Sequence, residues 1–177
     1  LDLPAIFVNG GPMQGGPFLH NRKSDSTSII EGVGRLLAGQ ITDDDLLSME
    51  NRCAPGCGSC SFLGTANTMC CLAEALGMSL SGSAMVPAVS SARLAAAQRS
   101  GQAIVKLVEK NITARQIITA ESIENAVRLT SAIGGSTNLL LHIPAIATEA
   151  GFDRDWWKFF DEASHRIPLL TGISPSG

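Results

Sequence analysis

The five cysteines of this 177-residue chain are concentrated in one short stretch of sequence. Cys53, Cys57 and Cys60 follow a C-x3-C-x2-C spacing, and the adjacent pair Cys70 and Cys71 comes shortly after them. Thiols that only fill a core are not expected to cluster in this way, and glycines beside Cys57 and Cys60 leave the backbone free to wrap around a ligand. Soft thiolates in a glycine-rich turn favour zinc or an iron–sulfur cluster over hard cations. We therefore expect the function to lie in this segment.

Composition and charge exclude several classes of protein. A hydrophobic content of 45% over 177 residues is typical of a globular domain with a proper core. A formal charge of −3 without any run of Lys and Arg argues against a nucleic-acid partner. No run of eighteen apolar residues occurs, so no membrane span is expected. The start is interrupted by Asp2 and Pro4 and does not resemble a secretory signal.

The pattern of thiols and histidines leaves more than one kind of site open. An odd number of cysteines with an adjacent pair favours reduced thiols in a cytoplasmic compartment over a disulfide framework. A closed zinc site needs four ligands, and His20, His142 and His165 lie far apart without paired spacing. Cys57 and Cys60 form a C-x-x-C motif ahead of a predicted helix, although the flanking sequence does not continue as a thioredoxin-like fold requires. A small zinc- or thiol-based regulatory module and a catalytically inactive fragment remain as alternatives.

The periodicity of apolar residues predicts a helix-rich α/β fold with a parallel sheet core. The apolar run 4–12 and the shorter run 167–170 each predict a buried strand of the parallel type. The glycine-rich segment 10–16 would then lie at the carboxyl end of a strand, the edge at which open α/β sheets bind ligands. Residues 79–89 predict a loop. Helices are predicted at 24–40, 42–49, 65–77, 90–110, from 113 to about 116, and at 121–133, 139–150 and 153–164.

The cysteines differ in where they lie relative to these predicted helices, and this difference suggests different roles. Cys70 and Cys71 fall inside the helix 65–77 and are interpreted as small buried hydrophobic residues. Cys60 stands just before that helix, where the helix dipole favours a thiolate or a negatively charged cluster. Cys53 and Cys57 are either incidental loop thiols or supporting residues. The pattern does not decide between these roles.

Two further expectations concern the predicted helix 139–150. This segment is apolar almost all round, which indicates a buried helix in which Pro144 is tolerable only near the first turn. His142 within it is expected to be a buried, satisfied histidine and not a metal ligand.

A series of segments in fixed order carries a family resemblance. They are Gly-Gly-Pro-Met at 10–13, Cys-Ser-Phe-Leu-Gly-Thr-Ala-Asn-Thr-Met at 60–69, Leu-Ala-Glu-Ala-Leu-Gly at 72–77, Pro87 with Arg93, Ala-Ile-Gly-Gly-Ser-Thr-Asn at 132–138 with His142, Ile-Pro-Leu-Leu at 167–170 and Pro-Ser-Gly at 175–177. Together they resemble the family of dihydroxy-acid, phosphogluconate and sugar-acid dehydratases over essentially the whole chain. The form of the segment after Cys60 favours the phosphogluconate and sugar-acid branch.

The resemblance implies a fold, a reaction and its cofactors. Residues 1–177 would be the central part of the N-terminal cluster-binding α/β domain of a two-domain enzyme, without the C-terminal β-barrel domain that carries a catalytic serine. Such enzymes remove water from a 2,3-dihydroxy carboxylic acid and give a 2-keto acid. They are homo-oligomers, dimers or tetramers, that hold a [2Fe–2S] or [4Fe–4S] cluster and usually Mg²⁺. Their small-molecule substrate is a sugar acid or a branched dihydroxy acid.

The resemblance also assigns residues. Cys60 matches the last of three cluster cysteines, while the other two and a metal-binding Cys-Asp-Lys motif would precede Leu1. Ser136, Thr137 and Asn138 would form a loop that faces the substrate carboxylate. Gly10 and Gly11 would shape the floor of the pocket through their backbone.

Two expectations concern what lies beyond these residues. No catalytic residue is assigned, and this chain alone is expected to be inactive. Trp156 and Trp157 are expected to pack against the rest of the protein or another subunit.

Overall fold

The structure is a computed structural model that describes residues 2–19 and 22–174. The helices are α1 (Ser26–Leu37), α2 (Asp43–Arg52), α3 (Thr65–Ala75), α4 (Ser91–Glu109), α5 (Ala114–Ile117), α6 (Ala120–Ala132), α7 (Leu139–Glu149) and α8 (Trp156–Arg166). Strands β1 (Phe18–Leu19) and β2 (Arg22–Lys23) pair in antiparallel fashion, with Phe18 opposite Lys23. All eight predicted helices are confirmed, with ends that differ by a few residues.

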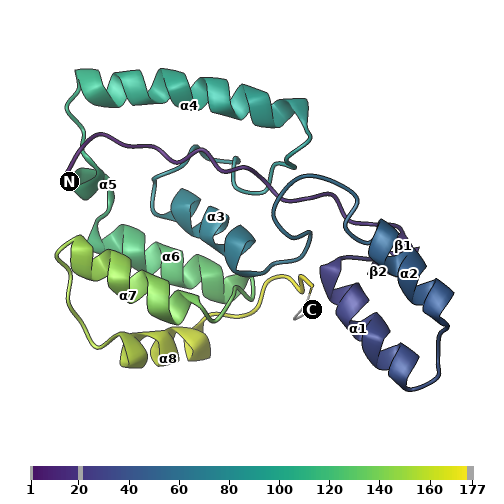
Figure 1. Cartoon of the computed structure of the whole chain (residues 1–177). Coiled ribbons are helices and arrows are strands. Elements are labelled where there is room, and N and C mark those ends of the chain that lie inside the picture. Colours follow the sequence, from purple (N-terminus) through teal and green to yellow (C-terminus); the bar gives the residue numbers. More distant parts are fainter. Residues whose placement is uncertain (1, 20–21, 175–177) are drawn as a thin grey trace.

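The described residues form a helical body and a projecting arm (Figure 1). Helices α3, α6, α7 and α8 pack together in the body, and α4 lies on the other side of the extended N-terminal segment. Helices α1 and α2 pack against each other and make the arm at the far end. The candidate site lies in the body, around the start of α3.

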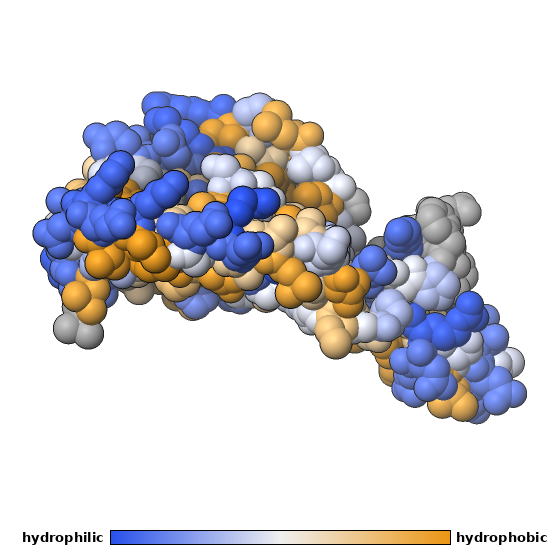
Figure 2. All heavy atoms as spheres, turned by 90° about the horizontal axis from the view of Figure 1, so that it is seen from above, coloured by the Kyte–Doolittle hydropathy of each residue, from blue (hydrophilic) through white to orange (hydrophobic). Residues whose placement is uncertain are grey.

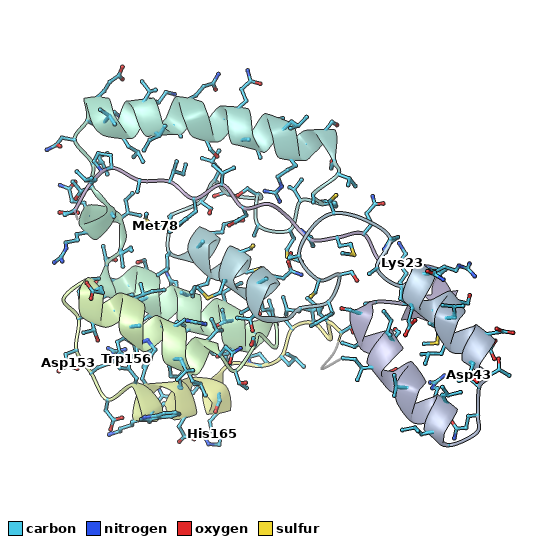
Figure 3. The ribbon with its side chains drawn as sticks, in the orientation of Figure 1. Lys23, Asp43, Met78, Asp153, Trp156 and His165 are labelled. Carbon is cyan, nitrogen blue, oxygen red and sulfur yellow. The ribbon has the colours of Figure 1, made fainter. Side chains whose placement is uncertain are left out.

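The core of the body is apolar and lies between α3 and α6. Leu72, Ile123 and Val127 are almost completely buried there, and Met78 closes the core beneath the extended N-terminal segment (Figure 3). Burying a large aliphatic side chain of this kind contributes about 1.5–3 kcal/mol. The start of α6 is fixed locally as well, because Thr119 forms a capping box with Ser122. Helix positions near the site therefore follow from local capping and from core packing.

The predicted parallel sheet core is not found among the described residues. Segment 4–9 runs extended through the body, but its backbone bonds reach loops instead of a neighbouring strand: Phe7 N–H donates to the Met78 carbonyl at 2.6 Å. A single parallel bridge joins Pro12 to Ser59. Segment 167–170 is likewise not a strand, and Leu169 and Leu170 are largely exposed. A strand needs a paired neighbour, and the described chain provides none beside either segment.

Two expectations about single residues were also wrong. Pro144 lies in the middle of α7, beyond its first turn, where the buried residues Leu139 and Ile143 hold the helix against the core. Trp156 packs within this chain: its ring lies 6.2 Å from that of Phe159 in an edge-to-face arrangement (Figure 3). The neighbouring Trp157 is 69% exposed, so the expectation that it contacts another part of the protein stays a prediction.

The outer surface of the body mixes polar and apolar areas. Figure 2 shows hydrophilic atoms over much of the upper face, interrupted by apolar patches, with the arm projecting at one end. Exposed apolar side chains on the first helix of the arm include Ile30 and Leu37. None of the helices in the described part of the chain combines the length and the apolar character needed to cross a membrane.

Asp25 joins the arm to the C-terminal segment and gives the protein a pH-dependent contact. Its buried carboxylate accepts hydrogen bonds from Thr27, from the Ser28 N–H and from the Ser174 hydroxyl, the last at 3.0 Å. Burial alone raises the pKa of Asp25, but the hydrogen bonds outweigh it and hold the pKa below its ordinary value of 3.8.

We expect Asp25→Asn to lower the free energy of unfolding by about 1 kcal/mol at pH 6, because the uncharged amide has one accepting oxygen, whereas the carboxylate uses one oxygen for the N-cap bonds and the other for Ser174. A depressed pKa means that the stabilising effect of the charge is present above pH 3.8 and is lost as the pH falls through the lower native value. The difference between wild type and variant should therefore shrink below pH 3.8 in urea titrations. Asp153→Asn, at an exposed position, is the control. A difference that stays constant down to about pH 2 would contradict this role.

Candidate functional site

The cysteine loop between α2 and α3 is anchored on the glycine turn at residues 10–12. The Ser59 N–H donates to the Gly11 carbonyl at 3.0 Å, and the Met13 N–H donates to the Ser59 carbonyl at 2.7 Å. Gly58 adopts a φ of +130° and lies against the backbone of Pro12 and Met13 without room for a side chain. The two segments are far apart in sequence, yet they form one layer that carries Cys60.

Asn67 ties the same loop to the first turn of α3. Its side chain is 1% exposed, and its amide nitrogen donates to the carbonyls of Cys60 at 2.6 Å and Phe62 at 2.7 Å. The amide oxygen accepts from the Ser59 hydroxyl at 2.6 Å. The thiol of Cys60 is exposed at this point of the loop. One buried side chain therefore holds the backbone on both sides of Cys60.

The N-terminus of α3 presents unpaired backbone donors next to Cys60. Its N-cap is Gly64, which has no side chain to accept a hydrogen bond. Within the described chain, the N–H groups of Thr65 and Ala66 find no acceptor. Such donors and the positive end of the helix dipole stabilise a negative charge that lies close to them.

The turn before α7 packs against the start of α3. Asn138 donates to the Thr65 hydroxyl at 2.7 Å, the Ser136 hydroxyl lies 3.2 Å from the same oxygen, and the Ser136 N–H donates to the Thr68 hydroxyl at 3.0 Å. A side chain at Gly135 would lie only 2.9 Å from the Thr68 methyl group. A glycine at this position thus allows the turn and the helix to approach closely.

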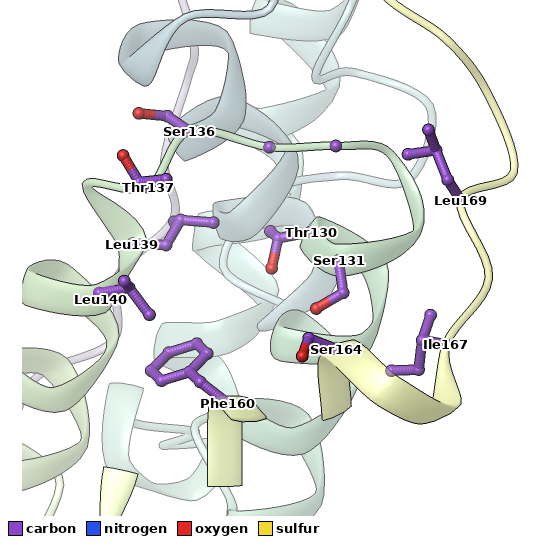
Figure 4. Close-up of a pocket in the computed structure, with 12 residues that line it drawn as sticks. Thr130, Ser131, Ser136, Thr137, Leu139, Leu140, Phe160, Ser164, Ile167 and Leu169 are labelled. Atoms are coloured by element: carbon purple, nitrogen blue, oxygen red, sulfur yellow. The ribbon is translucent and has the colours of Figure 1, made fainter. Parts of the chain in front are cut away.

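These parts enclose a cavity of about 500 Å³. Its lining comes from three sources: Cys60 and the end of the cysteine loop, the first turn of α3, and the turn 134–137. A second cavity of about 440 Å³ lies on the other side of that turn. Figure 4 shows the turn as one wall of this second cavity, with Phe160 and Ile167 opposite. The first cavity has the size of a small-molecule site and combines a thiol, hydroxyl groups and free amides.

The structure brings together most of the residues predicted from the sequence. Cys60, Ser136 and Thr137 line the first cavity, and Asn138 borders it through its bond to Thr65. Gly11 does not line the cavity, but its carbonyl accepts a hydrogen bond from the N–H of Ser59, the residue before Cys60. Gly10 does not line the cavity and has open space around it.

Three residues of the first turns of α3 were not assigned a role from the sequence. Thr65, Asn67 and Thr68 make most of the bonds that join the loop, the helix and the turn 134–137. The signal was present in the Thr-Ala-Asn-Thr motif at 65–68, which carried the family resemblance. Thr65 and Thr68 bond to Ser136 and Asn138, which the fold brings beside them from a distant part of the sequence. Asn67 instead bonds to the cysteine loop.

The remaining thiols differ in environment. Cys70 and Cys71 lie within α3 as expected but are only half-buried, and burial raises the pKa of both, that of Cys71 to about 11. Cys53 is buried at the end of α2, whereas Cys57 is exposed. His142 is exposed, so the expectation of a buried histidine was wrong. His20 lies outside the described residues.

A complete metal centre is not formed by the described residues. No group of three His, Cys, Asp or Glu side chains comes close enough to hold an ion there. The zinc module considered from the sequence therefore finds no support in this part of the chain. Cys60 by itself fits the role of one cluster ligand, because its side chain is exposed and lines the cavity beside the amino end of α3.

Comparison with known proteins identifies the family. The sequence model of the family described as "Dihydroxy-acid/6-phosphogluconate dehydratase N-terminal" matches residues 1–177, the whole chain. The chain belongs to this family. Relatives named dihydroxy-acid dehydratase include those of Lachnospira eligens, 48% identical, Nitratidesulfovibrio vulgaris, 45% identical, and Caldanaerobacter subterraneus, 49% identical. Each alignment covers all of this chain and 31–32% of the relative, so this dehydratase-family chain spans about a third of their length.

Proposed function

We propose that this chain is part of a hydro-lyase that converts a 2,3-dihydroxy carboxylic acid to a 2-keto acid. The observation that carries the proposal is the cavity in which Cys60, the free amides of α3 and the turn 134–137 meet. The chain's membership of the dehydratase family and the names of its relatives support the reaction class. The cavity brings one possible cluster ligand, Cys60, beside donor groups that suit a carboxylate.

We propose that Cys60 supplies one thiolate ligand to an iron–sulfur cluster, [2Fe–2S] or [4Fe–4S]. A bound cluster supplies a Lewis-acidic iron that can assist the departure of a hydroxyl group. The remaining cluster ligands, the ligands of Mg²⁺ and the catalytic base would come from the two thirds of the relatives' length that have no counterpart here. This chain on its own would then be inactive.

The residues around Cys60 are suited to bind and orient an anionic substrate. The N–H groups of Thr65 and Ala66 can donate to a carboxylate, and the hydroxyls of Ser136 and Thr137 stand at the opposite wall. The hydrogen bond from Asn138 to the Thr65 hydroxyl holds these two walls in a fixed position relative to each other. Orientation of this kind lowers the entropic part of the activation barrier.

The names of the relatives also bear on which acid is used. The sequence after Cys60 favoured the phosphogluconate and sugar-acid branch, whereas the relatives described above are named dihydroxy-acid dehydratases. We therefore favour a branched 2,3-dihydroxy acid as the substrate.

Three broader properties belong to the same proposal. In the complete domain, the extended segment 4–9 would join a parallel sheet with strands from outside this chain. The bridge between Pro12 and Ser59 is consistent with that arrangement. The five free cysteines support a reducing, cytoplasmic environment. A homo-oligomer is proposed from the family resemblance alone.

The test uses the full-length protein purified without oxygen. Iron and acid-labile sulfide are measured with the visible absorption spectrum, and 2-keto acid formation is followed with a branched 2,3-dihydroxy acid and with 6-phosphogluconate. We expect a coloured protein that dehydrates the branched acid with the higher kcat/KM. A colourless protein that holds zinc and leaves both acids unchanged would overturn the proposal. A preference for 6-phosphogluconate would overturn only the choice of substrate.

A further inference from the structure

We infer that Asn67 is the positioning residue for Cys60, and this inference rests on the proposed role of Cys60 as a cluster ligand. Residues 53–64 contain no helix or paired strand apart from the bridge at Ser59, so the loop has little regular structure to hold its shape. Asn67 belongs to a helix whose inner face is in the core. It is therefore a fixed point to which the loop can be attached.

The bonds of Asn67 surround Cys60 on both sides. Its amide nitrogen uses both hydrogens, one on the carbonyl of Cys60 itself and one on the carbonyl of Phe62, while its oxygen accepts from Ser59. The three partners are the Ser59 hydroxyl just before the thiol and the backbone carbonyls of Cys60 and Phe62 at and after it. The direction in which the Cys60 side chain leaves the loop is set by this backbone.

Only an amide meets this requirement. Aspartate has the same shape, but its carboxylate would place oxygen against the two carbonyl oxygens that now receive hydrogen bonds. Alanine would leave the carbonyls of Cys60 and Phe62 without this donor. Residues that orient a metal ligand typically change metal affinity when they are replaced. The identity of residue 67 should therefore affect the affinity for the cluster, although the side chain of residue 67 is not itself a cluster ligand.

The sharpest experiment is Asn67→Asp in the full-length protein, with Asn125→Asp as its matched control. Asn125 is exposed on α6, so the control introduces the same charge away from the loop. We expect the cluster affinity of Asn67→Asp to fall by about 10- to 100-fold, the range typical of such supporting residues. Iron and sulfide per polypeptide and the electron paramagnetic resonance spectrum of the reduced cluster are the readouts, with activity as a third.

A second readout needs no cluster. In cluster-free protein, hydrogen exchange of the backbone amides at 59–63 should become about tenfold faster in Asn67→Asp, while the core of α6 keeps its protection. A merely structural role for Asn67 would weaken protection across the whole body. Unchanged exchange at 59–63 together with wild-type cluster content would overturn the inference.

A milder variant covers the case in which Asn67→Asp does not fold. Ser59→Ala removes only the hydroxyl that donates to the Asn67 oxygen and, at a longer distance, to the Gly11 carbonyl. It should shift exchange and cluster content in the same direction by a smaller factor, and no shift would again count against the inference. If the wild-type protein held no iron, the proposed function would fail, while the exchange measurements would still decide whether Asn67 anchors the loop.

Discussion

Replacing Cys60 with serine in the full-length protein is expected to abolish cluster binding and to reduce kcat/KM by at least about 1,000-fold, or about 4 kcal/mol of transition-state stabilisation. A serine oxygen is harder than sulfur and holds its proton far more tightly, so it is a poor ligand for an iron–sulfur cluster. The measurements are iron and sulfide content, the visible spectrum and the rate of 2-keto acid formation. Because the change removes one atom and replaces it with a smaller one, the fold of the loop should be retained.

Cys57→Ser is the matched control for this prediction. Cys57 is also exposed, lies three residues away in the same loop and does not line the cavity. It should therefore keep its cluster and its activity. If both variants lost the cluster equally, the cysteine loop would have two ligands and the assignment to Cys60 alone would be wrong. Retention of a normal cluster by Cys60→Ser would remove the main support for the site.

The helices were predictable because their signals are local. The apolar spacing in 65–77 and the capping residues before α2 and α6 lie within a few residues of the elements that they define. The prediction that Thr42 begins a helix was confirmed by its capping box with Asp45. Such bonds form between neighbours in sequence and need no information about the rest of the protein.

The strands failed because a strand is defined by a partner distant in sequence. The run 4–9 has the composition of a buried strand, yet Phe7 and Val8 are more than half exposed in the described chain. Composition reports that a segment tolerates an extended conformation and burial, but not which segment will pair with it. Among the described residues, the one trace of the predicted arrangement is the bridge between Pro12 and Ser59.

The sequence predicted residues that line the candidate site, but not the hydrogen bonds that join them. The family resemblance pointed to Cys60 and to Ser136, which the fold brings to one cavity although 76 positions separate them. No spacing rule could have shown that Thr65 lies between Ser136 and Asn138. The role of Asn67 was not predictable, because an asparagine in a helix gives no sign that its amide is buried against a loop.

Gly11→Ala is expected to lower the free energy of unfolding by about 2–5 kcal/mol, the second large effect. Gly11 has a φ of +89°, a conformation that costs an alanine about 1–2 kcal/mol. An added Cβ would also lie 2.3 Å from the Val86 carbonyl oxygen and 2.8 Å from the Arg93 guanidinium. Crowding of this kind costs about 1–3 kcal/mol when the backbone has to move.

Substitutions at two other glycines distinguish the cost of the positive φ from the cost of crowding. Gly10→Ala, at the preceding position, meets nothing within 4 Å and has no positive φ, so its effect should stay within about 0.5 kcal/mol. Gly39→Ala has a φ of +68° in open space and should show the backbone cost alone, about 1–2 kcal/mol. Urea denaturation of the three variants checks this order.

The consequence of Gly11→Ala should also reach Cys60. The Gly11 carbonyl accepts the Ser59 N–H, so a displaced turn shifts the backbone directly before the proposed cluster ligand. We therefore expect Gly11→Ala to lose cluster content as well as stability, whereas Gly39→Ala should lose stability alone. Gly11→Ala and Gly39→Ala could instead lose equal stability and both keep a normal cluster content. That result would show that the added Cβ at Gly11 causes no steric cost and that the turn does not position the cysteine loop.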